Sequence, residues 1–373
     1  MKKILFPLLF LAAATTVQAQ NFAKRMGFDH DLFNHLDLSV TAGTTGVGFD
    51  LAMPVGKYLQ VRTGAAFMPK IHYDMLFDVM VGDQTLHSLK KESGFQQMIN
   101  KLESLTGIVV KDKVTMVGEP SFNNFKFLID VFPFRNKHWH ITAGFYIGNG
   151  MLGYAYNKTD DMASLLGVML FNNLYDRINN AKEANTDIEG LNFSLPEDYT
   201  EKVLSYGRMS LPEGYYSHDI YATENVYWDH DVKEVYIDKD VESDTYNEVV
   251  EKYIHHKGDL KVAKGDVIHK KGDPYLIEPN EEGMVKVQAK IKRFKPYLGF
   301  GYGGPISKDH KTSISFDAGL MFWGGTPNVI VHDGIDLIND VEGTQYQVAD
   351  YVKFIKKFKC FPVISLRITQ RLF

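Results

Sequence analysis

Two short segments of the chain carry histidines beside carboxylates or beside each other, and these residue types hold metal ions. Asp229-His230-Asp231 and His255-His256 both lie in the long segment 148–293. A zinc site needs three or four ligands at defined spacing, and neither segment has a second cluster to complete one. His138 and His140 form a further pair that lacks two more ligands. We therefore predict no metal and no cofactor, and interpret these histidines as polar residues of the surface or interior.

Hydrolytic chemistry would need a nucleophile beside a base, as in the Ser/His or Asp/His pairs of membrane-embedded hydrolases. The sequence contains no Gly-x-Ser-x-Gly elbow. His332, Asp333 and the histidines of 148–293 keep a hydrolase of the membrane rim or of a surface loop as an alternative. Gly301-Tyr302-Gly303-Gly304 is rich in glycine, but no helix follows it, so it is not a phosphate-binding loop. We assign no catalytic residue.

The strongest residue-level pattern is a set of charged residues that occupy alternate positions between apolar ones. Four are acidic and four are basic: Asp37, Asp50, Asp130, Asp317, Arg62, Lys126, Arg367 and Arg371. Charges enclosed in a narrow space are costly unless they are paired. Equal numbers therefore predict a network of interior ion pairs. We expect Arg371 to reach Asp37, Arg367 to reach Asp317, and Arg62 to reach Asp130.

These charges lie in segments where apolar residues alternate with small or polar ones, the pattern of a β-strand with one apolar face. Val47, Phe49 and Leu51, for example, alternate with Gly48 and Asp50. Each segment has the length of a tilted strand that crosses a bilayer. The segments lie near residues 35–42, 47–54, 59–67, 124–132, 138–147, 294–302, 312–323 and 360–373. A barrel of about eight strands is just wide enough for its own side chains to fill it.

The connections between the strands alternate between short and long. Short turns lie at 55–58, 133–137 and 303–311, and long connections at 68–123, 148–293 and 324–359. Outer-membrane barrels have short periplasmic turns and longer extracellular loops. The sequence therefore predicts an all-β protein, an antiparallel transmembrane β-barrel of about eight strands with a large mixed α/β extracellular insertion at 148–293. Aromatic residues near the outer strand ends, Tyr146 and Tyr297 among them, are expected in the interfacial belt.

The N-terminal residues predict export. Lys2 and Lys3 precede the apolar segment Ile4–Ala14, and Val17-Gln18-Ala19 matches a cleavage site. We therefore predict a signal peptide at 1–19 and a mature barrel protein at 20–373. The single cysteine excludes an internal disulfide framework. A formal net charge of −5 gives no broad attraction to nucleic acid, which we do not expect as a partner.

The long connections contain segments with structure of their own. Residues 94–105 form an amphipathic pattern, and a second helix is predicted after Asp160-Asp161. Short β segments are expected at 235–237, 260–262 and 285–291. The alternation of the last one shifts phase near Arg293, which predicts a β-bulge and a sixth barrel strand that extends beyond the membrane. We find no internal repeat.

Several runs resemble Bacteroidetes-type outer-membrane β-barrel proteins, of the small OmpA/OmpX-like barrel class. They are Gly46–Phe49 through Phe67–Pro69, Lys295–Gly303 with Phe316–Leu320 and Gly325–Pro327, and the terminal Phe373. The resemblance covers about a quarter of the chain. It implies a place in the cell outer membrane, with outer-membrane lipid and the barrel-assembly machinery as partners. Phe373 would be the assembly signal, although the apolar face of its strand ends out of phase, on Leu372.

The function expected from this pattern is a structural or surface-binding role through the extracellular loops, toward an extracellular ligand that the sequence does not identify. Two alternatives stay open. One is a hydrolase of the membrane rim or of a surface loop. The other is a wider barrel of ten or more strands that conducts solutes and recruits β segments from 148–293.

Overall fold

The computed structural model describes residues 35–184, 197–228, 232–237 and 249–372. The predicted signal peptide, Asp229-His230-Asp231 and Phe373 lie outside the described residues. The chain forms two compact units. The first comprises Met1–Pro212, Leu276–Ile338 and Gln345–Phe373, and the second comprises Glu213–Tyr275 and Asn339–Thr344.

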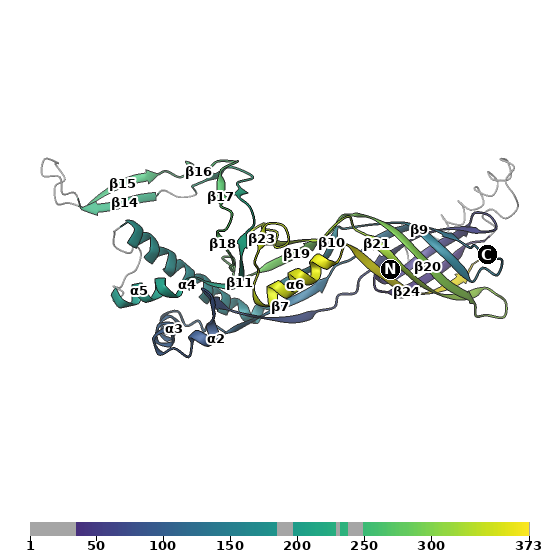
Figure 1. The fold of residues 1–373 in the computed structure, drawn as a ribbon, viewed down its shortest axis with the longest axis horizontal. Helices are drawn as coiled ribbons and strands as arrows, with labels where there is room; N and C mark the ends of the chain where they lie inside the picture. Colours follow the sequence, from purple (N-terminus) through teal and green to yellow (C-terminus); the bar gives the residue numbers. More distant parts are fainter. Residues whose placement is uncertain (1–34, 185–196, 229–231, 238–248, 373) are drawn as a thin grey trace, which may run out of the picture. The chain divides into compact units, whose positions relative to one another are not determined.

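Eight antiparallel strands of the first unit close into a barrel (Figure 1). In spatial order they are β1 (Asp37–Gly43), β2 (Gly46–Pro54), β3 (Leu59–Phe67), β8 (Asn124–Val131), β9 (Trp139–Gly148), β20 (Phe294–Pro305), β21 (Thr312–Phe322) and β24 (Cys360–Arg371). Closure comes from β24, which pairs with β1 from Asp37↔Arg371 to Gly43↔Ser365. A closed barrel has no edge strand with unpaired backbone groups. The predicted antiparallel barrel of eight strands is confirmed.

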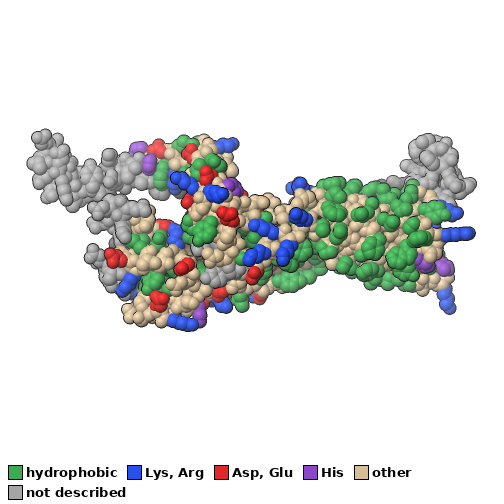
Figure 2. Space-filling model, in the orientation of Figure 1, with side chains coloured by type: hydrophobic (Ala, Val, Ile, Leu, Met, Phe, Trp, Pro, Cys, Tyr) green, Lys and Arg blue, Asp and Glu red, His purple; other side chains and the backbone are tan. Residues whose placement is uncertain are grey.

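The two faces of the barrel differ because side chains of a strand point alternately to opposite sides. On β20, Leu298, Phe300 and Tyr302 are exposed, whereas Gly299 and Gly301 face inward. Figure 2 shows that hydrophobic side chains cover the visible face of the barrel. With every strand paired on both sides and an apolar outer surface, the barrel meets the two requirements for spanning lipid. Among the described residues, no helix is long and apolar enough to cross a membrane.

The two ends of the barrel carry different connections. At one end, called here the short-turn end, brief turns join β2 to β3, β8 to β9 and β20 to β21. At the opposite end, the long-connection end, β1 and β2 are joined by a tight turn, and long segments follow β3, β9 and β21. The insertions therefore all leave the barrel at one end, as the alternation of connection lengths predicts.

The β9–β20 pair continues past the long-connection end as a separate ladder. Here β10 (Met151–Asn157) pairs with β19 (Lys286–Lys290). Two backbone bonds join the ladders: Ile291 N–H donates to Gly150 O (2.9 Å) and Gly148 N–H to Arg293 O (3.1 Å). The strand predicted to run through Arg293 is thus interrupted between Lys290 and Phe294, and a register shift follows in the partner strand, between Met151 and Gly153. The new sheet has the order β22 (Asn328–Val331), β19, β10, β7 (Lys113–Pro120) and β4 (Tyr73–Asp78).

Helices and part of a small sheet complete the first unit. The helices are α2 (Leu86–Leu89), α3 (Ser93–Thr106), α4 (Thr159–Ala184), α5 (Glu197–Tyr206) and α6 (Tyr346–Lys357). The small sheet includes β18 (Pro274–Ile277), β11 (Met209–Tyr216), β5 (Met80–Val81) and β6 (Gln84–Thr85). Strands β11 and β18 of that sheet continue into the second unit. The apolar faces of the two predicted helices are turned into the protein, since Phe95 and Ile99 of α3 and Leu165 and Phe171 of α4 are buried.

The second unit is built from two-stranded ribbons. They are β12 (Ile220–Tyr221) with β17 (Val267–His269), β13 (Val226–Tyr227) with β16 (Leu260–Val262), and β14 (Val232–Ile237) with β15 (Val249–His255). A short strand, β23 (Val341–Glu342), pairs with the end of β11.

The returning strand of this unit repeats every seven residues. Lys-Gly-Asp occurs at 257–259, 264–266 and 271–273. In each turn the aspartate carboxylate accepts a backbone N–H three residues upstream: His256 to Asp259 (2.7 Å), Ala263 to Asp266 (2.9 Å) and Lys270 to Asp273 (2.8 Å). The glycine of each turn has a positive φ of 88° to 96° and donates its N–H to the facing strand. The expectation of no internal repeat is therefore wrong.

Candidate functional site: the barrel interior

One half of the charged interior is organised around Arg62 of β3. Its Nη2 donates to Asp130 Oδ1 at 2.9 Å, and its Nη1 lies 3.8 Å from Asp50 Oδ2. Lys126 Nζ lies 2.7 Å from the other Asp50 oxygen. All four side chains are buried. Two cations therefore meet two carboxylates inside the barrel, and Arg62 lies beside Asp130 as the sequence predicts.

The other half is organised around Asp317 of β21. Arg367 approaches it through two bonds, Nη2 to Oδ1 at 3.1 Å and Nε to Oδ2 at 3.2 Å. His140 Nε2 lies 2.7 Å from the same Oδ1. Arg367 Nη1 also lies 3.9 Å from Asp130 Oδ2, which joins the two halves into one network. His140 was not predicted as a member of the network, although it is an inward-facing residue of β9.

The third predicted pair lies near the short-turn end. Arg371 Nε is 3.7 Å from Asp37 Oδ1. The other carboxylate oxygen of Asp37 accepts from Gln60 Nε2 at 3.1 Å and lies 3.5 Å from His35 Nε2. Arg371 is the most exposed predicted member, with 46% of its side chain accessible. The structure thus brings together the partners of all three predicted pairs, two inside the barrel and one at its mouth.

Glycines make room for these side chains. A Cβ at Gly64 would lie 2.2 Å from Asp50 Oδ1, and one at Gly301 would lie 2.3 Å from His140 Cε1. The small residues opposite the apolar positions are therefore the space that the charged side chains occupy. Since the members of the network are buried, the barrel is filled at this level.

Nearer the long-connection end, apolar side chains fill the interior instead. The buried members of this cluster, called here the apolar plug, are Phe122, Leu128, Tyr146, Tyr297, Met321 and Val363. Tyr146 and Tyr297 meet edge to face with ring centroids 5.4 Å apart. The Tyr297 hydroxyl occupies the space over Gly299 and Gly319, where a Cβ would lie 2.3 and 2.6 Å from it. The placement of Tyr146 and Tyr297 in the interfacial belt is therefore wrong.

A buried lysine accompanies the plug. Lys295 of β20 is fully buried, and its Nζ donates to Asn124 Oδ1 at 2.9 Å and Arg293 O at 3.2 Å. The ammonium also lies 5.3 Å from the centre of the Phe122 ring, in the range of a cation–π contact. Among the described carboxylates, none forms an ion pair with it. Lys295 was missed because the alternation was followed only from Leu298 onward. Extended back to Phe294, the same alternation places Lys295 on the inward side with Gly299 and Gly301.

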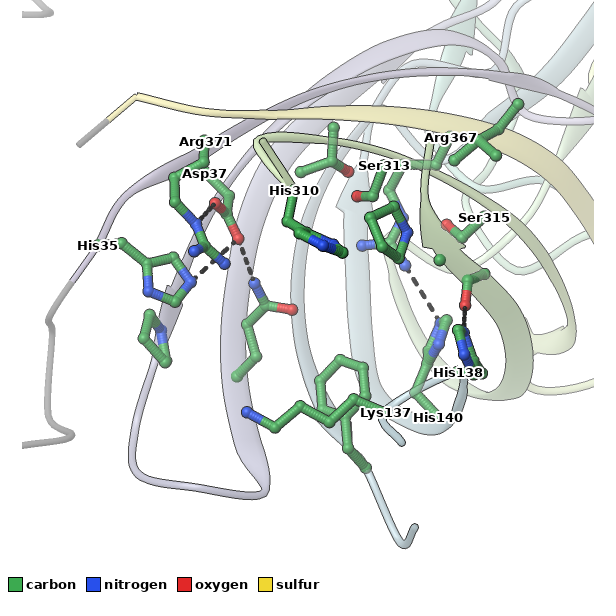
Figure 3. Close-up of a pocket in the computed structure, with 18 of the residues that line it drawn as sticks. His35, Asp37, Lys137, His138, His140, His310, Ser313, Ser315, Arg367 and Arg371 are labelled. Carbon is green, nitrogen blue, oxygen red and sulfur yellow. Dashed lines mark hydrogen bonds and ion pairs between the residues drawn. The ribbon is translucent and has the colours of Figure 1, made fainter. Parts of the chain in front are cut away.

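A cavity of about 290 Å³ lies at the short-turn end, next to the charge network. Figure 3 shows residues that line it. Its floor includes His140 and Arg367 of that network. Its walls come from the strand ends and from all three short turns, which contribute Lys57, Lys137 and Lys311 among others. Figure 3 shows His310 between the Asp37–Arg371 pair and Arg367.

Outside the barrel, one group of side chains resembles a hydrolase triad, but its hydrogen bonds do not support that function. In the second unit Ser217 Oγ lies 2.9 Å from His218 Nδ1, and His218 Nε2 lies 3.5 Å from Asp340 Oδ1. The Ser217 hydroxyl, however, donates its hydrogen to Asn339 O at 2.9 Å. It must then accept a hydrogen from His218, so the imidazole is not placed as a base toward it.

The remaining candidate residues make contacts that belong to turns and to ring stacking. Asp333 Oδ1 accepts the N–H of Ile335 at 3.0 Å, within a turn. Burial lowers the pKa of His332, and the neighbouring Asp333 opposes that shift in part. His255 stacks on Trp228 with ring centroids 5.0 Å apart. Within the described residues, no group of three or more His, Cys, Asp or Glu side chains is placed to hold a metal ion.

Of the comparisons with known proteins, the one with solved structures found similar chains. No family model matches the chain, and no curated protein matches it. CarO2 of Acinetobacter baumannii is 13% identical with a TM-score of 0.34, over 90% of this chain and 98% of that one. CarO of the same organism is 12% identical with a TM-score of 0.33, over 90% and 97%.

The third similar structure is a major outer membrane protein from Thermus thermophilus. It is 10% identical with a TM-score of 0.27, over 91% of this chain and 98% of that one. These solved structures are outer-membrane β-barrel proteins. At such low scores the similarity supports no detail of the site. The functional interpretation therefore rests on the barrel itself, which is closed, filled, built from eight strands and apolar on its outer surface.

Proposed function

We propose that this protein is an outer-membrane β-barrel that anchors a binding region at the cell surface and does not conduct solutes. The observation that carries the proposal is the filled interior. Asp50, Asp130 and Lys295 are fully buried inside the barrel, and so is Met321 of the apolar plug. Two successive layers of buried side chains, one charged and one apolar, support a barrel that is closed to solutes.

The proposed orientation places the short-turn end in the periplasm and the long connections outside, as barrels of this kind are built. The exposed apolar side chains would contact outer-membrane lipid, and Phe373 would serve the barrel-assembly machinery. Membership of the Bacteroidetes-type class and cleavage of residues 1–19 belong to the same proposal. The export pattern of the N-terminal residues and the closure of the barrel both support it.

The second unit supports a binding role. Large apolar side chains stand exposed on its narrow ribbons: Tyr221, Val226, Tyr227, Leu260, Val267 and Ile268. A two-stranded ribbon offers little core in which such side chains can be buried. Exposed apolar side chains such as these are available for contact with a partner. We therefore assign contact with an extracellular ligand to this region in preference to the barrel.

The solute-conducting alternative is not supported. The β segments of 148–293 that it would recruit pair in the five-stranded sheet, the small sheet and the ribbons, and β20 enters the barrel as one of eight strands. A barrel of this size is filled by its own side chains.

Conductance and topology test the proposal together. The purified protein in planar bilayers should show no stable open channel, whereas a general porin in the same lipid should. Single cysteines at Lys264 and at Lys57, in a Cys360→Ser background, should be labelled on intact cells at the first position alone. Reproducible single-channel steps would contradict the closed interior, and labelling at Lys57 alone would reverse the orientation.

A further inference from the structure

The cavity at the short-turn end has an unusual balance of charge. Its lining includes five cationic side chains, Lys57, Lys137, Lys311, Arg367 and Arg371, together with four histidines, His35, His138, His140 and His310. Among its described lining residues, Asp37 is the one carboxylate. The protein as a whole is acidic, with a formal net charge of −5. The cavity is therefore a local concentration of positive and titratable groups on a chain of the opposite sign.

The single carboxylate does not neutralise this excess, because its oxygens already have partners. Asp37 Oδ1 faces Arg371, and Oδ2 accepts from Gln60 and lies near His35. Arg367 is likewise engaged with Asp317. Among the described residues, none of the three lysines forms a side-chain ion pair. Asp309, outside the lining, accepts the backbone N–H of Lys311 at 3.1 Å and is the carboxylate nearest to that lysine in the chain. The three lysines come from three different turns, and all three are exposed residues of the cavity lining.

The backbone carries a second, independent signal at the same place. Among the described residues, the non-glycine residues with positive φ are Lys137 (55°) and His310 (54°), and both line the cavity. A side chain in this left-handed region costs about 1–2 kcal/mol, which glycine avoids. Strain of this kind persists where a site requires it. Two turns thus have a lysine and a histidine, Lys137 and His310, in an unfavourable backbone conformation, and both residues line the same cavity.

A hydrogen bond also fixes the orientation of one histidine of the lining. His138 Nδ1 lies 2.7 Å from Gly303 O. A carbonyl oxygen can only accept, so Nδ1 carries a hydrogen. Nε2 is then an acceptor in the neutral ring and a donor to an anion only when the ring is protonated.

We propose that this cavity binds a small anion with phosphate or carboxylate groups, held by Lys57, Lys137, Lys311 and His310. Its volume is at the lower limit for small-molecule sites, which selects a compact ligand. Ammonium and imidazole groups form charge-assisted hydrogen bonds with phosphate and carboxylate oxygens. In the orientation of the proposed function the site faces the periplasm, where the same chemistry is offered by soluble anions and by the headgroups of anionic phospholipids.

Isothermal titration of the full mature chain in a neutral detergent tests this directly, with pyrophosphate and citrate as probes. At least one probe should bind with a 1:1 stoichiometry and weaken as salt is raised. Lys137→Gly should reduce the affinity by about tenfold or more, the loss of one hydrogen bond to a charged group. The same variant should raise the melting temperature, because glycine tolerates the positive φ.

A lysine with a purely structural role would not give this combination of a lower affinity and a higher melting temperature. Lys137→Asn and His310→Asn serve as second variants, because asparagine tolerates the left-handed region and removes the cationic or imidazole group without loosening the turn. Lys308→Gln is the matched control, a lysine of the His310 turn that does not line the cavity, and it should bind as the wild type does.

Lipid nanodiscs separate the two sources of ligand. If a headgroup is the occupant, discs with phosphatidylglycerol should abolish pyrophosphate binding to the wild type, whereas phosphatidylcholine discs should not. If a soluble anion is the occupant, both discs should bind the probe equally. The proposal is overturned if neither probe binds in detergent, or if Lys137→Gly and Lys137→Asn bind as tightly as the wild type.

Discussion

The two layers that fill the barrel are built from the same alternation of strands but hold together in different ways. Toward the short-turn end, Arg62, Asp130 and Asp317 belong to one network of buried charges. Toward the long-connection end, rings such as Tyr146 and Tyr297 pack by shape. A charged layer requires each partner to be present, because an unpaired ion inside the barrel is costly. An apolar layer loses contacts in proportion to the atoms removed.

The two layers contribute different properties to a narrow barrel. We expect the charges to favour one arrangement of the strands, since each carboxylate accepts hydrogen bonds from only a few partners. Apolar rings then close the remaining cross-section without needing partners. The comparison predicts that a change of one or two atoms will be severe in the charged layer, while the apolar layer will respond to the volume that is lost.

The largest effect is expected from Asp130→Asn. Asp130 is fully buried and is shared by Arg62 and Arg367, so its loss leaves two cations undercompensated without creating a cavity. The free energy of unfolding should fall by about 3–5 kcal/mol. Urea unfolding in lipid vesicles, followed by heat-modifiable gel migration, measures it. A loss below about 1 kcal/mol would indicate a hydrated interior and would end the distinction between the layers.

The next effect is expected from Met321→Ala in the apolar plug. Met321 is fully buried, and truncation of such a side chain costs about 2–5 kcal/mol, depending on how far the cavity collapses. The same unfolding assay applies. Leu320→Ala is the matched control, because Leu320 is the adjacent residue on the lipid-facing side. If the two variants unfold alike, Met321 does not contribute to a packed layer.

A double-mutant cycle on Asp317→Asn and Arg367→Gln sharpens the comparison further. The two side chains share two hydrogen bonds, so their effects on unfolding should be non-additive by about 0.5–3 kcal/mol. His140 contacts the same carboxylate and must be retained in every variant. A cycle on Met321→Ala and Leu128→Ala in the plug should show weaker coupling. Additive behaviour at Asp317 and Arg367 would mean that the ion pair does not act as a unit.

Much of the barrel could be predicted from the sequence because apolar residues alternate with small or polar ones in each of its strands. The ion pairs could be anticipated for the same reason, since strand order in a closed barrel fixes which inward positions face each other. Asp317 and Arg367, for example, lie on neighbouring strands β21 and β24. The location of the break between β19 and β20 could not be predicted, because a bulge and a break between two strands produce the same phase shift.

Other features were missed for identifiable reasons. The apolar plug includes Phe122, which precedes its strand, so alternation could not place it inside the barrel. The ribbon repeat has a period of seven on the returning strand, where Lys-Gly-Asp recurs, but six on the facing strand, where Tyr216, Ala222 and Trp228 pair with it. Two different periods conceal the repeat from a search at one spacing. The Lys-Gly-Asp triplet was nonetheless a visible signal.

The smallest change in stability is expected for a carboxylate outside the barrel, which serves as a contrast to the buried charges inside it. Asp161 lies at the start of α4, where its Oδ1 is 2.6 Å from Lys111 Nζ and its Oδ2 accepts the Thr115 N–H at 2.7 Å. It therefore ties α4 to β7. Burial alone would raise the pKa of Asp161, but hydrogen bonds from Lys111 and Thr115 outweigh it and hold the pKa below its usual value.

Because its folded-state pKa is lowered, ionised Asp161 favours the folded state. Its contribution is present above about pH 4, the unfolded value for aspartate, and is lost as the pH falls through the lower folded value. Asp161→Asn should cost about 1–2 kcal/mol at neutral pH, near the range for hydrogen bonds to a charged group. The difference between wild type and variant should shrink below about pH 4. Hydrogen exchange of the α4 amides measures this locally, with Asp160→Asn as the neighbouring control. A difference that stays constant down to about pH 2, well below the unfolded pKa, would show that the carboxylate charge is not what ties α4 to β7.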